Sequence, residues 1–217
     1  MAIENIFLFS FAKPANFTFM AGQYIQLRML DGEGKASVRS YSITSSPKES
    51  TLDFCAFFSP QGQSATYFSK LKIGSPVFFD GPYGNFVCSL NHAPCKVFIG
   101  FGTGLAPLVS MVKEQLLLNN AQHISLFAVI GKNETVLWES MLESLSAANP
   151  AFKYDIVFTD GEESADTTHL IEESSLKQLL EQSADFYLCG QLEKVKKIRL
   201  DLFQQGVLEN KIHFEIF

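Results

Sequence analysis

Apolar and polar residues alternate in the first part of the chain, as short β-strands require. The cleanest alternation covers residues 24–29, and clusters of Gly, Pro and Ser separate it from similar segments. One short helical segment, residues 66–71, interrupts the series. The predicted strands cover residues 3–11, 24–29, 38–44, 52–58 and 77–80. Short strands at this density predict a small antiparallel β-barrel.

The pattern changes after residues 91–94, where continuous apolar strands begin to alternate with amphipathic helices. The first predicted strand of this part ends at Ile99, and the others cover residues 124–130, 154–158, 186–188 and 212–217. The predicted helices cover residues 105–116, 138–145, 176–180 and 195–203. This alternation predicts a parallel sheet with helices on both faces and a ligand crevice at the carboxyl ends of its strands. We therefore predict two domains, 1–92 and 93–217.

The stretch from Val97 to Pro107 joins a buried strand to a helix through three glycines, and it includes Gly102, Thr103 and Gly104. A glycine turn before a helix offers free backbone N–H groups to a phosphate. The alternative is a turn in which the glycines serve packing alone. Both this turn and the pair Cys189-Gly190 follow predicted strands, so both are expected at the crevice edge.

Composition narrows the possible functions. A formal net charge of -6 disfavours a nucleic-acid partner, which needs a basic face. No apolar run is long enough for a membrane span, and the N-terminus lacks the basic start of a signal peptide. The four cysteines contain no close pair, which argues against zinc and iron–sulfur sites. We expect no metal site and a reduced, cytoplasmic setting.

Two polar segments of the first domain are candidate binding sites. The run Arg39-Ser40-Tyr41-Ser42 offers a guanidinium for phosphate, an aromatic plate and hydroxyl groups, although it also suits a solvated barrel strand. The segment from Gly62 to Phe68 leads into the short helix; Ser64 or Thr66 suits its N-cap, and its free N–H groups suit a second phosphate.

Five motifs follow one another over nearly the whole chain: Arg39-x-Tyr41-Ser42, Gly81-Pro82-Tyr83-Gly84 (a tight turn), Gly100-x-Gly102-Thr103-Gly104-Leu105-Ala106-Pro107, Tyr187-Leu188-Cys189-Gly190 and the ending Glu215-x-Phe217. Taken together and in this order, they resemble the motifs of the ferredoxin–NADP reductase family. The resemblance implies a flavin-binding antiparallel barrel followed by an α/β domain that binds a pyridine nucleotide. It also implies hydride transfer from NAD(P)H to a bound flavin, then electron transfer to a separate acceptor.

The resemblance implies a role for each matching residue. Arg39 corresponds to the flavin-phosphate ligand, Tyr41 to the residue against the isoalloxazine ring, and Ser42 to the hydroxyl beside flavin N5. Cys189 and Glu215 correspond to catalytic residues near the nicotinamide. The remaining cofactor-binding candidates are Gly62, Ser64, Thr66, Gly102, Thr103, Gly104, Asp160 and Phe217.

Some positions depart from the family pattern. An additional first barrel strand is usual in the family, as are a serine where Ala65 stands and a Lys or Arg where Phe57 stands. The resemblance implies FAD, and these departures, which would weaken the hold on a pyrophosphate, keep FMN as the alternative. Asp160, followed by further carboxylates, favours NADH over NADPH because it would repel a 2′-phosphate.

Two functions follow. The first is a reductase that passes electrons to a ferredoxin-type protein, a haem or oxygenase partner, or free flavin. The alternative is a non-catalytic nucleotide-sensing or docking subunit with a degenerate flavin site.

Overall fold

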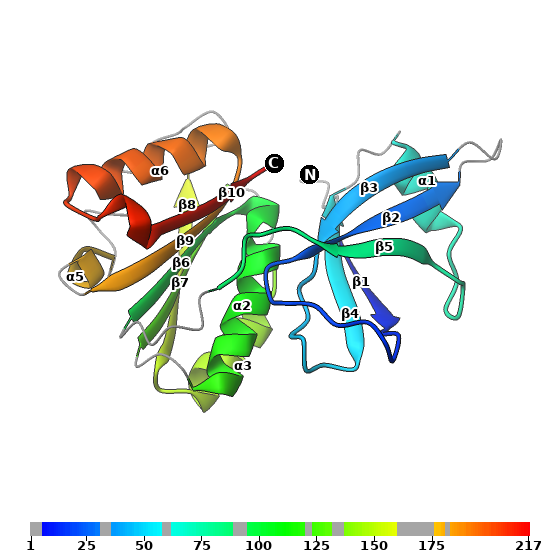
Figure 1. The fold of residues 1–217 in the computed structure, drawn as a ribbon, viewed down its shortest axis with the longest axis horizontal. Coiled ribbons are helices and arrows are strands. Elements are labelled where there is room, and N and C mark those ends of the chain that lie inside the picture. The colour runs from blue at the N-terminus through cyan, green and yellow to red at the C-terminus, as the bar shows by residue number, and fades with distance from the viewer. Residues whose placement is uncertain are drawn as a thin grey trace.

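The computed structural model describes residues 6–30, 36–57, 62–88, 95–119, 123–131, 137–159, 176–180 and 183–217. Two halves lie side by side (Figure 1), and the N-terminal half contains two antiparallel sheets, β1-β4 and β3-β2-β5. Its elements are β1 (Ile6–Ala12), β2 (Tyr24–Leu30), β3 (Ala36–Ser42), β4 (Thr51–Phe57), α1 (Gln63–Ser69) and β5 (Phe78–Tyr83).

Alternation along the strands places one face of each sheet in a shared core. Ile25, Leu27 and Met29 of β2 are buried, whereas Arg28 between them is exposed and forms an ion pair with Asp80 on β5. The core is rich in phenylalanine, and it is filled by Phe19, Ile25, Leu27, Met29, Ile43, Leu52, Phe54, Ala56 and Phe68. Packing across this core holds the two sheets together.

The two antiparallel sheets meet along β3 and β4. Outside the named strands, an isolated antiparallel bridge joins Ile43 to Phe54. Thr44 N–H also donates to the Asp53 carbonyl oxygen, at 2.8 Å. On the other side of the bridge, residues 40–42 pair only with β2 in the described ladders, and residues 55–57 only with β1. The facing edges of β3 and β4 therefore part beyond Phe54, which opens a gap between the sheets.

The C-terminal half is a five-stranded parallel sheet of order β10-β9-β6-β7-β8. Its central strand β6 is buried along its whole length, as expected of a parallel strand covered on both faces. The elements are β6 (Cys95–Phe101), η1 (Gly102–Gly104), α2 (Leu105–Leu118), β7 (His123–Gly131), α3 (Glu139–Ala148), β8 (Phe152–Thr159), α5 (Leu176–Leu180), β9 (Ala184–Gly190), α6 (Leu192–Gln204), η2 (Glu209–Lys211) and β10 (Ile212–Ile216).

Helices cover both faces of this sheet. Helices α2 and α3 pack into the core on one face, while α5 and α6 pack on the other. On α6, Val195, Ile198 and Leu202 form the buried stripe of an amphipathic helix. Helix α2 is buried nearly all round because it lies between the sheet and the N-terminal half (Figure 1).

The two halves are joined through α2. The Ser110 hydroxyl donates to the Ser45 carbonyl oxygen, at 2.6 Å in a buried position. Nearby, Lys113 Nζ lies 3.1 Å from a carboxylate oxygen of Glu49. Ala21 and Phe86 of the N-terminal half belong to the same apolar cluster as α2. These contacts fix the first half against helix α2.

The predicted fold class, an antiparallel domain followed by a parallel α/β domain, is confirmed. One local prediction is wrong: Gly81, Pro82 and Tyr83 continue β5 instead of forming a tight turn. Pro82 is tolerated there because β5 is an edge strand, where a missing N–H need not cost a ladder bond. The predicted boundary at residues 91–94 and the predicted strand residues 3–5 and 58 lie outside the described residues.

Within the described part of the chain, no helix is long and apolar enough to cross a bilayer. All four cysteines are buried, and none of them forms a disulfide. The described residues also include no group of three or more His, Cys, Asp or Glu side chains arranged to hold a metal ion.

Candidate functional site

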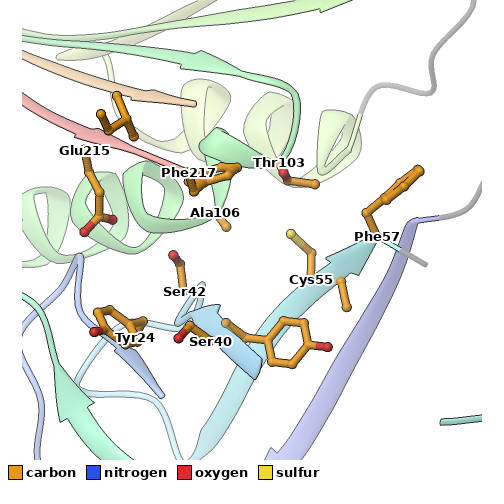
Figure 2. Close-up of a pocket in the computed structure, with 12 residues that line it drawn as sticks. Tyr24, Ser40, Ser42, Cys55, Phe57, Thr103, Ala106, Glu215 and Phe217 are labelled. Carbon is orange, nitrogen blue, oxygen red and sulfur yellow. The ribbon is translucent and has the colours of Figure 1, made fainter. Parts of the chain in front are cut away.

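A cavity of about 440 Å³ opens where β3 and β4 part, between the two halves of the molecule (Figure 2). One wall comes from the N-terminal half and the other from the start of α2 and the C-terminus. The lining residues are Tyr24, Ser40, Tyr41, Ser42, Cys55, Ala56, Phe57, Thr103, Ala106, Glu215, Ile216 and Phe217. The cavity therefore draws on segments from both ends of the chain, which only the folded structure brings together.

Strand geometry shapes the N-terminal wall. After the Ile43–Phe54 bridge, the antiparallel register would place residues 40–42 opposite residues 55–57, but these two segments border the cavity instead. In an antiparallel sheet, alternate residues direct N–H and C=O groups to each strand edge. The gap thus exposes backbone donors and acceptors beside the Ser40 and Ser42 hydroxyls.

Tyr41 provides the aromatic surface of this wall. Its ring stacks on Phe54, with centroids 4.9 Å apart and planes at 24°. The tyrosine hydroxyl also donates to Ser64 Oγ, at 3.5 Å. Burial raises the pKa of Tyr41, while the hydrogen bond to Ser64 and the charge of Arg39 act in the opposite direction. These contacts hold the Tyr41 ring in place, and its hydroxyl is protonated at neutral pH.

The opposite wall carries the carboxyl group of Glu215. Figure 2 shows this group and the Ser42 hydroxyl directed toward the cavity from its two sides. Burial raises the pKa of Glu215. Beyond it, Phe217 is 62% exposed, and its backbone N–H donates to the Gly190 carbonyl oxygen at 3.3 Å. The C-terminal residues are therefore tied to the end of β9 while their side chains remain accessible to a ligand.

The glycines of the predicted phosphate loop have different structural roles. Gly102 has φ +55°, and no heavy atom lies within 4 Å of the position that a Cβ would occupy. At Gly104, by contrast, a Cβ would lie 2.2 Å from the carbonyl oxygen of Cys189. Gly104 allows the loop to pack against the end of β9. Gly102 is conformationally required and leaves open space beside the backbone.

Cys189 lies on β9 in register with Glu215 on β10, and it is fully buried in the core beside α2. It is not among the residues that line the cavity. Burial raises the pKa of its thiol, and the nearby Glu215 carboxylate raises it further. The side chain therefore lies next to the site as a small apolar group and not as a thiolate.

The other predicted cofactor residues of the N-terminal half are not among the residues that line the cavity. Arg39 is exposed on β3 and donates to the Val38 carbonyl oxygen at 2.9 Å. The N-cap of α1 is Gly62, and no side chain caps it, so the interpretation of Ser64 or Thr66 as N-cap is wrong. The Thr66 hydroxyl instead donates to the Gly62 carbonyl oxygen within the helix, at 3.4 Å.

Asp160 lies outside the described residues, so the structure gives no position for the carboxylate expected to select NADH.

Sequence reasoning missed Tyr24 and Cys55 as lining residues. Tyr24 could have been found from strand pairing, because β2 places it directly opposite Ser42. Cys55 gives no comparable sequence signal; it lines the cavity because β3 and β4 separate at that point. Burial raises the pKa of the Cys55 thiol to about 12. Both residues belong to the N-terminal wall.

These walls suit a flat conjugated ring with a polar edge. Tyr41 offers an aromatic face, the serine hydroxyls offer hydrogen bonds, and the parted strands offer backbone N–H and C=O groups. The isoalloxazine ring of a flavin has this combination of a large π-surface with carbonyl and N–H groups along one side. The residues present therefore fit a flavin ring on the N-terminal wall.

Two known family models match the chain, one on each half. Residues 3–88 match the model of the oxidoreductase FAD-binding domain. Residues 98–199 match the model of the oxidoreductase NAD-binding domain. The chain belongs to the ferredoxin–NADP reductase-like oxidoreductases.

Individual relatives are distant but cover nearly the whole chain. The reductase component of a Ralstonia naphthalene 1,2-dioxygenase/salicylate 5-hydroxylase system is 27% identical over 95% of this chain and 62% of its own length. A flavohemoprotein of Rhizobium meliloti is 27% identical over 94% of this chain and 52% of its own length. The chain thus spans about half to three fifths of these relatives.

A solved structure shares the fold. The ferredoxin NADP+ reductase of Neisseria gonorrhoeae, determined with bound FAD and NADP, superposes with a TM-score of 0.82 at 22% identity. The match covers 98% of this chain and 92% of that one.

Proposed function

We propose that this chain is a flavin-dependent oxidoreductase that takes a hydride from NADH or NADPH and passes electrons to a separate acceptor. The observation that carries the proposal is the cavity between an FAD-binding and an NAD-binding domain, with walls from both. The relatives named above include a reductase component of a dioxygenase system. When bound, the flavin supplies the redox chemistry.

On the flavin side, we assign three roles to residues of the N-terminal half. Tyr41 supports one face of the ring through its stack on Phe54. Ser42 directs its hydroxyl into the cavity, where it can hydrogen-bond the N5 position (Figure 2). Arg39, exposed on the same strand, is the candidate contact for a flavin phosphate. Gly62, Ser64 and Thr66, at the start of α1, are the remaining candidates for this side.

The nicotinamide side uses the opposite wall. Gly102, Thr103 and Gly104 form the loop for the nucleotide phosphates, with open backbone at Gly102. Glu215 and Phe217 border the space in which the ring would lie. Cys189 limits the depth of this space as a buried apolar neighbour. These residues contribute to the rate by holding the donor carbon of the nicotinamide against the acceptor nitrogen N5 of the flavin and by excluding water.

The second substrate and the setting follow by analogy with the relatives. We propose a ferredoxin-type protein, a haem or oxygenase partner or free flavin as acceptor, and a cytoplasmic location consistent with four cysteines that form no disulfide. We also propose the domain limits 1–92 and 93–217, and a preference for NADH that rests on Asp160. Comparable kcat/KM for both nucleotides would contradict that preference.

Anaerobic mixing of the protein with a flavin and NADH tests the proposed function. We expect the visible flavin absorption to bleach in a reaction that requires the protein. A protein that binds flavin but fails to accelerate its reduction by either nucleotide would support the alternative, a non-catalytic sensing or docking subunit.

A further inference from the structure

Strand β1 has one edge bonded to β4, and among the described strands none pairs with its other edge. The Lys13 N–H donates to the Ser50 carbonyl oxygen at 2.9 Å, which continues the register of the β1-β4 ladder by one residue. In an antiparallel ladder, every second residue directs its backbone groups to the partner strand and the others direct theirs away. The residues whose backbone N–H and C=O groups point away from β4 are therefore Ile6, Leu8, Ser10 and Ala12.

This edge is accessible, and its strand has no charge. Leu8 is 55% exposed, and Ser10 and Ala12 are exposed as well. The sequence of β1 contains no charged residue and no proline. Charges and prolines on outer strands prevent pairing with a further strand. The other outer strands of the described sheets have such residues, which are Arg39 in β3, Asp53 in β4, Asp80 and Pro82 in β5, Lys153 and Asp155 in β8, and Glu215 in β10.

The apolar core of the N-terminal half extends to this edge. Phe7, Phe9 and Phe11 alternate onto the face of β1 opposite to Leu8. Phe9 and Phe11 stack on the core residue Phe54, with ring centroids 5.4 and 5.5 Å apart. Phe7 is nevertheless 48% exposed, and Phe9 and Phe11 are only partly buried. A further strand beside β1 would cover this phenylalanine surface.

We propose that β1 pairs antiparallel with β1 of a second copy of this chain, which joins two β1-β4 sheets into one sheet of order β4-β1-β1-β4. The register that pairs all seven residues has its two-fold axis at Phe9. It places Ile6 opposite Ala12 of the second copy and Leu8 opposite Ser10 of the second copy. These are the residues whose backbone groups point away from β4, so both edges gain their full set of hydrogen bonds.

The side chains favour a second copy as the occupant of this edge. In the same register Phe7 lies opposite Phe11 of the second copy, and Phe9 lies opposite Phe9, so aromatic side chains meet on the core side. No like charges are opposed, because β1 has none. The two-fold axis makes the strand complementary to itself. No residue of β1 lines the cavity, so this pairing leaves the candidate functional site open.

Sedimentation velocity at several protein concentrations tests the proposal. We expect a species of twice the mass of one chain, with a dimer Kd below about 10 µM. Leu8→Lys brings a charge into the joined sheet and should raise this Kd by at least about tenfold. Leu200→Lys makes the same change at an exposed leucine of α6 and should leave the Kd unchanged. A protein that stays monomeric up to about 100 µM would overturn the proposal, as would a dimer that Leu8→Lys does not weaken more than Leu200→Lys.

A second variant addresses the edge through the backbone. Ser10→Pro removes an N–H that points away from β4, so it should preserve the β1-β4 ladder and still give a monomer. Circular dichroism shows whether each variant is folded. Folded Ser10→Pro protein that dimerises as the natural chain does would contradict pairing through this edge.

Cross-linking tests the register and does not depend on weakening the dimer. Chains with Leu8→Cys are mixed with chains with Ser10→Cys and oxidised. Since the two positions lie opposite each other across the proposed axis, we expect disulfide-linked dimers of unlike chains. Each variant alone should link far less, because the four natural cysteines are buried. Linking that is no greater in the mixture than in either variant alone would contradict this register.

Discussion

Ser42 and Glu215 are separated by most of the chain, yet their polar groups enter the same cavity from opposite walls (Figure 2). Ser42 ends β3, one residue before the isolated Ile43–Phe54 bridge, and Glu215 lies on the last strand of the parallel sheet. In the proposed function, each of them contacts a planar ligand from a different half of the molecule. Their positions make them the most informative single residues for mutation.

Replacing Ser42 by alanine removes the hydroxyl directed into the cavity. We expect Ser42→Ala to retain flavin binding but slow flavin reduction by about ten- to hundredfold, the effect of losing one hydrogen bond to the reacting group. Anaerobic single-turnover stopped flow measures this rate. Ser37→Ala, on the same strand but away from the cavity lining, is the matched control. An unchanged rate in Ser42→Ala would remove this residue from the mechanism.

Glu215 gives a pH-dependent prediction. Because burial raises the pKa of this carboxyl in the folded chain, the folded protein retains the proton to higher pH than the unfolded chain. Ionising this buried carboxyl lowers the free energy of unfolding. The loss is absent below the ordinary glutamate pKa, and it develops as the pH rises through that value toward the raised pKa of the folded protein.

Glu215→Gln should therefore unfold at a higher temperature than the natural chain at about pH 7, with the difference vanishing at about pH 3.5. Thermal unfolding at both pH values measures this. The exposed Glu143 supplies the control, since Glu143→Gln should leave the transition unchanged. A Glu215→Gln advantage that is larger at the lower pH would have the wrong sign.

At the scale of elements, the loop between β6 and α2 shows what sequence can and cannot predict. The order strand, glycines, helix was evident from the spacing of apolar and glycine residues. Which glycine serves packing depends on β9, which lies far away in the chain: Gly104 faces the Cys189 carbonyl, whereas Gly102 faces open space.

The two glycines should respond differently to alanine. Gly102→Ala meets only backbone strain at φ +55° and should cost about 1 kcal/mol of unfolding free energy. Gly104→Ala forces a Cβ to within 2.2 Å of a backbone oxygen and should cost about 3 kcal/mol or more. Urea denaturation of both variants measures the difference. Equal losses would show that the contact with β9 does not decide the need for Gly104.

The parting of β3 and β4 could not be predicted from the pattern. Alternation correctly located both strands, but it carries no information about where two strands stop pairing. The cavity therefore includes Tyr24 and Cys55, neither of which the motifs singled out for a site. The motifs had singled out Ser42, Thr103 and Glu215, which line the cavity, from residue type and order alone. These are local properties, whereas the shape of the cavity depends on pairing between distant segments.

At the scale of the whole molecule, the cavity exists only if the two halves keep a fixed orientation. Helix α2 provides that constraint, since it belongs to the core of the parallel sheet and also contacts the N-terminal half. The buried bond from Ser110 to the Ser45 carbonyl crosses this interface. Removing it leaves a buried carbonyl oxygen without that donor.

Ser110→Ala should lower the free energy of unfolding by about 1–2 kcal/mol. Ser144 is the matched control, because it also donates from a helix to a carbonyl oxygen but does so at an exposed position within α3. Ser144→Ala should cost less than about 0.5 kcal/mol. Urea denaturation compares the two variants. A cost for Ser110→Ala no larger than that of its control would contradict an interface held through this bond.

The account depends on one location: the ring of a bound flavin in the gap between β3 and β4, facing the C-terminal residues. A crystal structure of the protein soaked with FMN measures this most directly. We predict ring density against Tyr41, with N5 beside the Ser42 hydroxyl and the opposite face turned toward Glu215 and Phe217. Density for the ring at any other place on the molecule, with this cavity filled only by solvent, would contradict the account.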